Sequence, residues 1–286
     1  FGIDSPMYAA TIDLESGAET VFADDVEIGD IIWMGPQPSV RSIAEGVGVG
    51  NSAPYGKFDE AVRAAVACGR KVHYINPSRY FNRLRLMEIL GRGDVEAGVS
   101  EVMTKAIISM CLVKEQCEID EIDAAGELGQ RMHTVARNAV RPGVLEQEIV
   151  GLMEGVTLSG GWGVSFTTIL TQHGETLHNH IHDKIIEPGR LLVIDAGAEG
   201  NSHYASDFTR TLPTGGKFTR KQRDIYEIVA RCNEFAFSIT RPGITYREVH
   251  IETMRVMLEG LKALDLVRGS VDDMVAENAR EIGRAH

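Results

Sequence analysis

The sequence predicts an α+β protein with two domains, a small α/β domain over residues 1–98 and a larger domain of helices and strands over residues 104–286. Short runs of β-forming residues, broken by Gly and Pro, fill the first part of the chain, and long amphipathic helices begin near residue 104. A helix–turn–helix pattern then occurs twice in the second part. These observations predict two domains, the second built by duplication.

The first domain is expected to contain four strands and two helices. Two runs of β-forming residues flank the turn-forming tripeptide at 15–17, which predicts a hairpin. Apolar residues three or four positions apart predict the longer helix, and residues 91–98 are expected to be a linker. The expected strands are residues 8–14, 19–23, 30–34 and 72–75, and the expected helices begin at Ser39 and span residues 58–67.

The second domain contains a repeated turn. Arg-Pro-Gly ends a long helix at residues 141–143 and another at residues 241–243, and each copy precedes a shorter helix. We interpret this recurrence as an internal duplication, with a chance match of a few residues as the alternative. The strand-rich residues 163–212 follow the first copy, whereas no corresponding strands follow the second. We therefore expect either an incomplete chain or a domain closed by something else.

Composition limits the classes of partner. A formal net charge of -12 argues against nucleic acid and against an anionic membrane surface. No apolar run approaches the roughly 20 residues that span a bilayer. No signal peptide is visible, although the chain begins at Phe1 without Met. Three of the four cysteines, Cys111, Cys117 and Cys232, lie in helical apolar patterns and are expected to be free core thiols of a cytoplasmic protein.

Two carboxylates form the first candidate site. Asp195 interrupts the apolar run of residues 191–197, and Asp207 lies in an expected return strand, equally far from a turn centred on Asn201. This spacing predicts that the two side chains face each other across an antiparallel hairpin. Facing carboxylates on a partly buried sheet repel each other and are costly to desolvate, so a divalent metal is expected between them. The alternative is a turn hydrogen bond for one Asp and a pair with Arg210 or Lys217 for the other.

Three histidines form a second candidate site. His178, His180 and His182 alternate along an expected strand, which would place them on one face. A three-histidine zinc site and a polar loop edge are both compatible with this pattern. We expect instead that one of these histidines lines the carboxylate site, where a neutral imidazole binds substrate or transfers a proton.

These residues belong to a longer pattern that resembles the Xaa-Pro aminopeptidase and prolidase branch of the pita-bread metallopeptidases, the M24 family. The two-aspartate block, with its Thr-Arg and Gly-Lys-Phe continuation, is the specific part, and the match around the histidines is weaker. The residues that carry the resemblance are 195–199, 204–211, 216–219, 222–226, 112–115, 118–119, 177–178 and 188–189, together with residues 1–4 and 33–35 of the first domain.

The resemblance implies a fold and a chemistry. It implies a duplicated pita-bread domain, preceded by the family's smaller α/β domain, and hydrolysis of the Xaa-Pro bond at peptide N-termini. Asp195 would chelate one metal ion through both oxygens, and Asp207 would bridge two ions, typically manganese, with cobalt or zinc possible. A hydroxide between the metals would attack the scissile bond, and His178 would steady the substrate. Family habit suggests a homodimer.

The sequence departs from the family pattern in its last residues. The family completes its site with a histidine in a His-Gly-x-Gly-His-like segment and two later glutamates, and neither feature is found here. His286, Glu277 and Glu281 lie in no such motif and are not assigned. Since two ligands rarely hold a pair of metals, the 286-residue chain by itself is expected to be inactive and to lack segments at both ends.

Three other functions remain open. An Xaa-Pro dipeptidase would differ from the aminopeptidase in the length of its substrates. A catalytically dead binding module would keep the fold and lose the metals, although it has little reason to keep two facing aspartates. A creatine-type or methyl-donor hydrolase on the same fold works without metal and need not keep Asp195 and Asp207 either.

Overall fold

The computed structural model describes the backbone of residues 2–282 and the side chains of residues 2–278. The chain forms two compact units, Phe1–Lys114 and Glu115–His286. Helix α5 (Glu101–Leu112) belongs to the first unit. No helix among the described residues is long and apolar enough to cross a membrane.

The first unit contains a three-stranded sheet in the order β1–β2–β3. Strands β1 (Ala9–Ile12) and β2 (Glu19–Phe22) form the expected hairpin, and β3 (Asn51–Ala53) pairs with β2 in parallel. Ser39 caps α2 (Val40–Gly46) as expected, because its side chain accepts from the Ser42 backbone N–H. The remaining elements are α3 (Gly56–Ala67), α4 (Tyr80–Leu90) and the short 3-10 helix η1 (Glu96–Gly98).

Two strands expected in this unit are wrong. Residues 30–34 belong to helix α1 (Ile28–Met34), whose start is fixed by a capping box between Glu27 and Asp30. Residues 72–75 belong to no strand or helix. Their backbone is held by single contacts instead of a ladder, since the Ser100 N–H donates to the Tyr74 carbonyl and the Tyr74 hydroxyl donates to the Val95 carbonyl. Apolar runs this short do not distinguish these cases.

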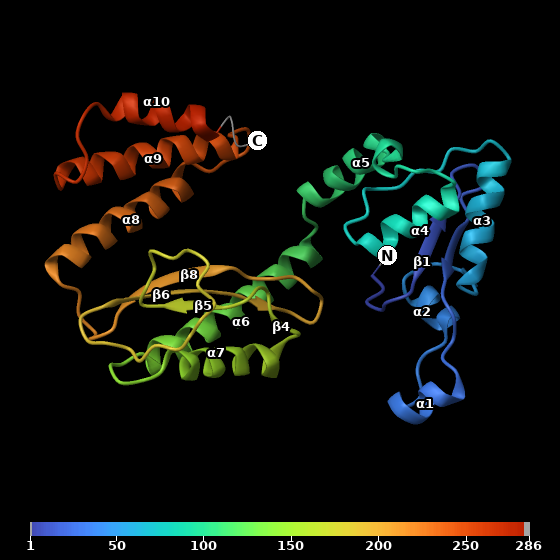
Figure 1. Ribbon diagram of the computed structural model, residues 1–286, viewed down its shortest axis with the longest axis horizontal. Helices are drawn as coiled ribbons and strands as arrows, with labels where there is room; N and C mark the ends of the chain where they lie inside the picture. Colours follow the sequence, from blue (N-terminus) through green and yellow to red (C-terminus); the bar gives the residue numbers. More distant parts are fainter. Residues whose placement is uncertain (1, 283–286) are drawn as a thin grey trace. The chain divides into compact units, whose positions relative to one another are not determined.

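The second unit has helices on one face of a three-stranded antiparallel sheet (Figure 1). Helices α6 (Gln116–Ala139) and α7 (Glu146–Gly160) pack against the sheet β5–β6–β8, formed by Ile169–Thr171, Leu191–Ala196 and Phe208–Pro213. A separate pair joins β4 (Gly163–Val164) to β7 (Ala198–Glu199). The buried core between helices and sheet consists of Met132, Ala136, Ile149, Val150, Met153, Leu170, Ile186, Leu192, Ile194 and Ala196.

The second helix pair repeats the turn of the first. Helices α8 (Arg220–Ile239) and α9 (Tyr246–Ala263) each begin with a capping box, at Thr219 and at Thr245. Gly143 and Gly243 have the same backbone φ angle of 91°, a value that favours glycine. The shared backbone conformation supports the duplication.

No strand follows β8 in the described part of the chain. Helices α8 and α9 are followed by α10 (Val271–Ile282), which packs against α9. Large apolar side chains on α8 therefore remain exposed, including Val229 at 57% and Phe237 at 86%.

The cysteines are free, as expected, but only one is a core thiol. Cys232 is buried, whereas Cys111 and Cys117 are exposed. Cys111 lies on α5 and Cys117 in the first turn of α6, and neither helix buries that face. The apolar pattern alone does not show which side of a helix finds a partner.

Candidate metal-binding site

Strand alternation gives the sheet of the second unit two different faces. Along β6 the buried residues are Leu192, Ile194 and Ala196, which pack on the helices, and Asp195 between them points to the other face. Along β8, Leu212 packs on the same core, which places Thr209 on the face with Asp195. We call this face, opposite α6 and α7, the open face.

The register brings Asp207 and Asp195 close, although not directly opposite. Asp195 pairs with Thr209 and Ala196 pairs with Phe208, the first residue of β8. Asp207 therefore lies one residue before β8 begins. Residues 207 and 209 point to the same face, so Asp207 is a diagonal neighbour of Asp195 on the open face. The expectation that the two carboxylates face each other directly is therefore wrong, because Thr209, two residues after Asp207, lies opposite Asp195. The two carboxylates nevertheless lie on the same face of the sheet, as expected.

Asp195 has a specific neighbour, Thr209, that was not expected from the sequence. The Thr209 hydroxyl donates a hydrogen bond of 2.8 Å to Oδ1 of Asp195 across the two strands. This bond fixes one carboxylate oxygen and leaves Oδ2 free to bind a cation. The signal was present in the sequence, because Thr209 lies two residues after Asp207 and must share its face in a strand.

The backbone around Asp207 is held from both sides. Ser206 is buried, and its carbonyl accepts a hydrogen bond of 2.7 Å from the Ser165 hydroxyl. On the other side, Phe208 packs edge-on against the His133 ring of α6, with 6.2 Å between the ring centroids. Asp207 itself is exposed. A fixed backbone therefore presents a carboxylate to solvent on the open face.

The alternative partners, Arg210 and Lys217, do not neutralise the pair among the described residues. The Arg210 guanidinium donates to the Thr209 carbonyl and lies 5.5 Å from the Phe208 ring centroid. No ion pair joins Asp195 or Asp207 to a cationic side chain in the described part of the chain. Two neighbouring carboxylates of this kind suit a hard divalent cation, which prefers oxygen ligands.

The three histidines do not form a strand. Residues 178–182 belong to a loop in which His178 and His180 are exposed and His182 is buried. The buried His182 ring packs against β5, where its Nδ1 lies 3.1 Å from the Leu170 carbonyl oxygen. The Ile181 N–H donates to the Asn179 side chain, a local turn that competes with a strand. A three-histidine zinc site is therefore excluded.

The loop that contains His178 is attached to the open face through the next residue, Asn179. The neighbouring Asn179 amide donates a hydrogen bond of 3.1 Å to the Thr171 hydroxyl on β5. Thr171 pairs with Val193, which shares its face with Asp195 two residues further along β6. The loop is thus anchored to the open face, and His178 is exposed beside it, with its ring centroid 6.3 Å from that of His180.

The described residues give an incomplete set of metal ligands. No group of three or more His, Cys, Asp or Glu side chains that could hold a metal ion occurs among them. Asp195 and Asp207 therefore fit a part of a divalent metal site, and further ligands are needed to complete it.

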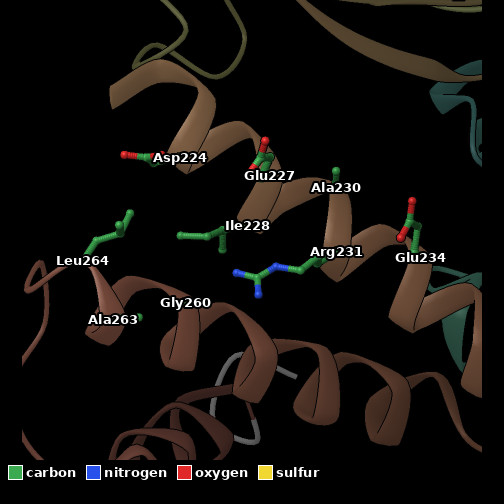
Figure 2. Close-up of a pocket in the computed structure, with 9 residues that line it drawn as sticks. All are labelled: Asp224, Glu227, Ile228, Ala230, Arg231, Glu234, Gly260, Ala263 and Leu264. Carbon is green, nitrogen blue, oxygen red and sulfur yellow. The ribbon is translucent and has the colours of Figure 1, made fainter. Parts of the chain in front are cut away.

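A groove lies between α8 and α9 of this unit (Figure 2). Gly260 allows the helices to approach, because a Cβ at that position would lie 2.8 Å from Ile228. Figure 2 shows Ile228 and Leu264 pointing toward each other between the helices, whereas Glu227 and Glu234 point away. The Arg231 side chain also extends between the helices, and we interpret the groove as a helix-packing feature.

Comparison with known proteins identifies the family of the chain. The model of metallopeptidase family M24 matches residues 120–275, more than half of the chain and the whole of the β5–β6–β8 sheet. The chain belongs to metallopeptidase family M24.

Individual relatives include a bacterial and a human protein. An Xaa-Pro aminopeptidase of Escherichia coli is 38% identical over 173 residues, which are 59% of this chain and 39% of that protein. The human Xaa-Pro dipeptidase is 27% identical over 299 residues, which are 100% of this chain and 59% of that protein. The chain thus spans about 40 to 60% of the length of these curated relatives.

Solved structures show the same fold. The aminopeptidase PepP of Pseudomonas aeruginosa superposes with a TM-score of 0.86 at 26% identity, covering 97% of this chain and 65% of that one. A zinc-substituted aminopeptidase P of E. coli, solved with product, has a TM-score of 0.83 at 27% identity and covers 97% and 66%. The expected combination of a pita-bread domain with a small α/β domain is therefore confirmed.

Proposed function

We propose that the complete natural protein is a metal-dependent aminopeptidase that hydrolyses the bond before a proline at the second position of a peptide. The observation that carries this proposal is the pair Asp195 and Asp207, placed on one open sheet face with no cation among the described residues to neutralise them. The Xaa-Pro aminopeptidases among the relatives provide the substrate class.

In this proposal the two aspartates hold divalent ions. Thr209 orients Asp195 by occupying one oxygen, and the clamped backbone on both sides of residue 207 aims the second carboxylate. When bound, two divalent ions, with manganese as the first to test and cobalt or zinc as alternatives, would lower the pKa of a water molecule and polarise the scissile carbonyl. Because the described residues supply two ligands, this activity is proposed for the complete natural protein.

His178 is proposed to act on the substrate and not on the metal. It is exposed on a loop anchored at the side of the open face, so its imidazole is free to hydrogen-bond a peptide bound there. A His178→Ala variant is expected to lower turnover and to leave metal content unchanged. Loss of metal in this variant would instead make His178 a ligand.

The experiment is a peptidase assay with manganese on two matched peptides that differ only in Pro or Ala at the second position. We expect release of the first residue from the proline peptide alone. Asp207→Asn should abolish the release, since the amide keeps the shape and removes the charge. Asp224→Asn on α8, a half-buried aspartate of the same unit, is the matched control and should keep full activity. Full activity of Asp207→Asn, equal to that of Asp224→Asn, would refute the proposal.

The match of the whole chain to the human Xaa-Pro dipeptidase favours that activity as the second candidate. Substrate length separates the two. An aminopeptidase releases the first residue from tripeptides and longer peptides, whereas a dipeptidase acts only on Xaa-Pro itself.

A further inference from the structure

His133 lies in the C-terminal half of α6, on the side of the helix that faces the sheet. Its Nε2 lies 3.0 Å from the backbone carbonyl oxygen of Ala196, and its ring meets Phe208 edge-on at 75°. Ala196 directly follows Asp195, and Phe208 directly follows Asp207. One side chain therefore contacts the residue after each aspartate, from the face opposite the carboxylates.

The hydrogen bond to the Ala196 carbonyl determines the tautomer of the His133 ring. A carbonyl oxygen only accepts, so Nε2 carries the proton and donates it. The other nitrogen, Nδ1, is buried and has no hydrogen-bond partner among the described residues. A buried polar atom without a partner costs about 1–3 kcal/mol. An apolar side chain would avoid this cost, so stability alone does not account for a histidine at this position.

The same surface of α6 holds the strands at a second point. Gly129, one turn before His133, has no side chain where Ser206 and Phe208 approach. A Cβ at Gly129 would lie 2.4 Å from the Ser206 hydroxyl and 3.1 Å from the Phe208 ring. The Ser206 hydroxyl in turn accepts from the Ala198 N–H at 3.1 Å. Helix α6 thus fixes both strands at residues next to the aspartates.

We propose that His133 is a positioning residue that sets the separation of Asp195 and Asp207. It touches neither carboxylate. Because neighbouring side chains of a strand point to opposite faces, fixing Ala196 and Phe208 from below fixes the directions of Asp195 and Asp207 above. This role rests on the proposed metal site. His133 would orient the metal ligands without binding the metal itself.

The test compares three variants of the complete natural protein, prepared free of metal and titrated with Mn²⁺ by calorimetry. His133→Leu removes the donor and keeps an apolar side chain, whereas His133→Gln keeps an N–H at a similar reach. Val150→Ala, in the core of the same unit, is the matched control for lost stability. Thermal unfolding of the metal-free proteins is measured alongside.

We expect His133→Leu to weaken Mn²⁺ binding about tenfold, the usual effect of removing such a partner. His133→Gln should bind within about threefold of wild type, because the donor is kept. Val150→Ala should unfold at a lower temperature with unchanged Mn²⁺ affinity. If His133→Leu does not fold, His133→Asn takes its place, since its shorter amide does not reach the Ala196 carbonyl.

The outcomes separate the two proposals. Wild-type affinity in His133→Leu, with Mn²⁺ bound by the wild type, would overturn the positioning role and leave the metal site intact. Weakened binding in Val150→Ala to the same extent would also overturn it, because lost stability alone would then explain the effect. No Mn²⁺ binding by the wild type would refute the metal site, and with it any role in positioning its ligands.

Discussion

The connection between β6 and β7 passes through Gly197, where a single methyl group is expected to be strongly destabilising. A Cβ at this position would lie 1.8 Å from the Ser206 carbonyl oxygen and 2.4 Å from the Ser165 hydroxyl. The nearer contact is with backbone, so it is not relieved by rotating a side chain. A Gly197→Ala variant must move the strand that leads to Asp207 by more than an ångström.

The size of the effect follows from the bonds that this movement breaks. The Ser165 N–H donates to the Gly197 carbonyl at 3.1 Å, the Ser165 hydroxyl donates to the Ser206 carbonyl at 2.7 Å, and the Ser206 N–H donates to the Ala198 carbonyl at 2.9 Å. Overpacking costs about 1–3 kcal/mol, and each hydrogen bond contributes about 1 kcal/mol. We expect the free energy of unfolding of the second unit to fall by about 4 kcal/mol.

The assay is urea unfolding followed by tryptophan fluorescence. The protein has two tryptophans, so a Trp33→Phe background leaves Trp162 as the reporter of the second unit. Gly215→Ala is the control, because nothing lies within 4 Å of a Cβ there. It should change stability by less than about 0.5 kcal/mol. A Gly197→Ala variant as stable as this control would refute the described strand contact.

Three further predictions concern other parts of the chain. Gly151→Ala should raise the stability of the second unit by about 1 kcal/mol in thermal unfolding, because Gly151 is exposed inside α7 with open space around it; a loss would contradict the helix. Hydrogen bonds from Arg70 hold the pKa of Asp13 well below its ordinary value of 3.8, so their contribution to stability is complete above that value and is lost as the pH falls through the lower folded pKa. Unfolding midpoints of Asp13→Asn should therefore fall less than those of wild type between pH 4 and pH 2, and equal slopes would refute the pairing. Burial raises the pKa of the Cys232 thiol, which should react with a thiol reagent far more slowly than the exposed Cys117; equal rates, measured by mass spectrometry, would contradict the burial.

Helix positions in the second unit followed from local chemistry. The capping boxes at Thr219 and Thr245 and the two Pro-Gly turns were readable because each depends on residues within four positions of one another. The strand expected at residues 30–34 failed for the same kind of reason. The capping box of α1 uses Glu27 and Asp30, and these local hydrogen bonds start a helix where the apolar run alone predicts a strand.

The register of the aspartate hairpin could not be read from local signals. Gly200 and Asn201 are the stronger turn formers, which favoured a turn centred on Asn201. The pairing of Glu199 with Ala205 centres the bend one residue later, and His203 adopts a φ of 66, which is uncommon for a non-glycine residue. This shift of one residue in the turn moved Asp207 from opposite Asp195 to a diagonal position.

The contacts behind the site depended on tertiary structure. His133 is separated from Ala196 by 63 residues, and no periodicity on α6 shows that one nitrogen meets a strand carbonyl. The alternation of His178, His180 and His182 was real in the sequence, yet the Asn179 turn and the bond of His182 to Leu170 produced a loop. Patterns therefore located the site, and packing determined its geometry.

The central claim is that Asp195 and Asp207 together hold divalent metal on the open face of the sheet. The most direct measurement is an anomalous difference map from crystals of the complete natural protein soaked in Mn²⁺. The account predicts a peak within bonding distance of both carboxylates, and no such peak in crystals of Asp195→Asn grown and soaked in the same way. Strong Mn²⁺ peaks elsewhere in the wild-type crystal, with none between these two side chains, would contradict it.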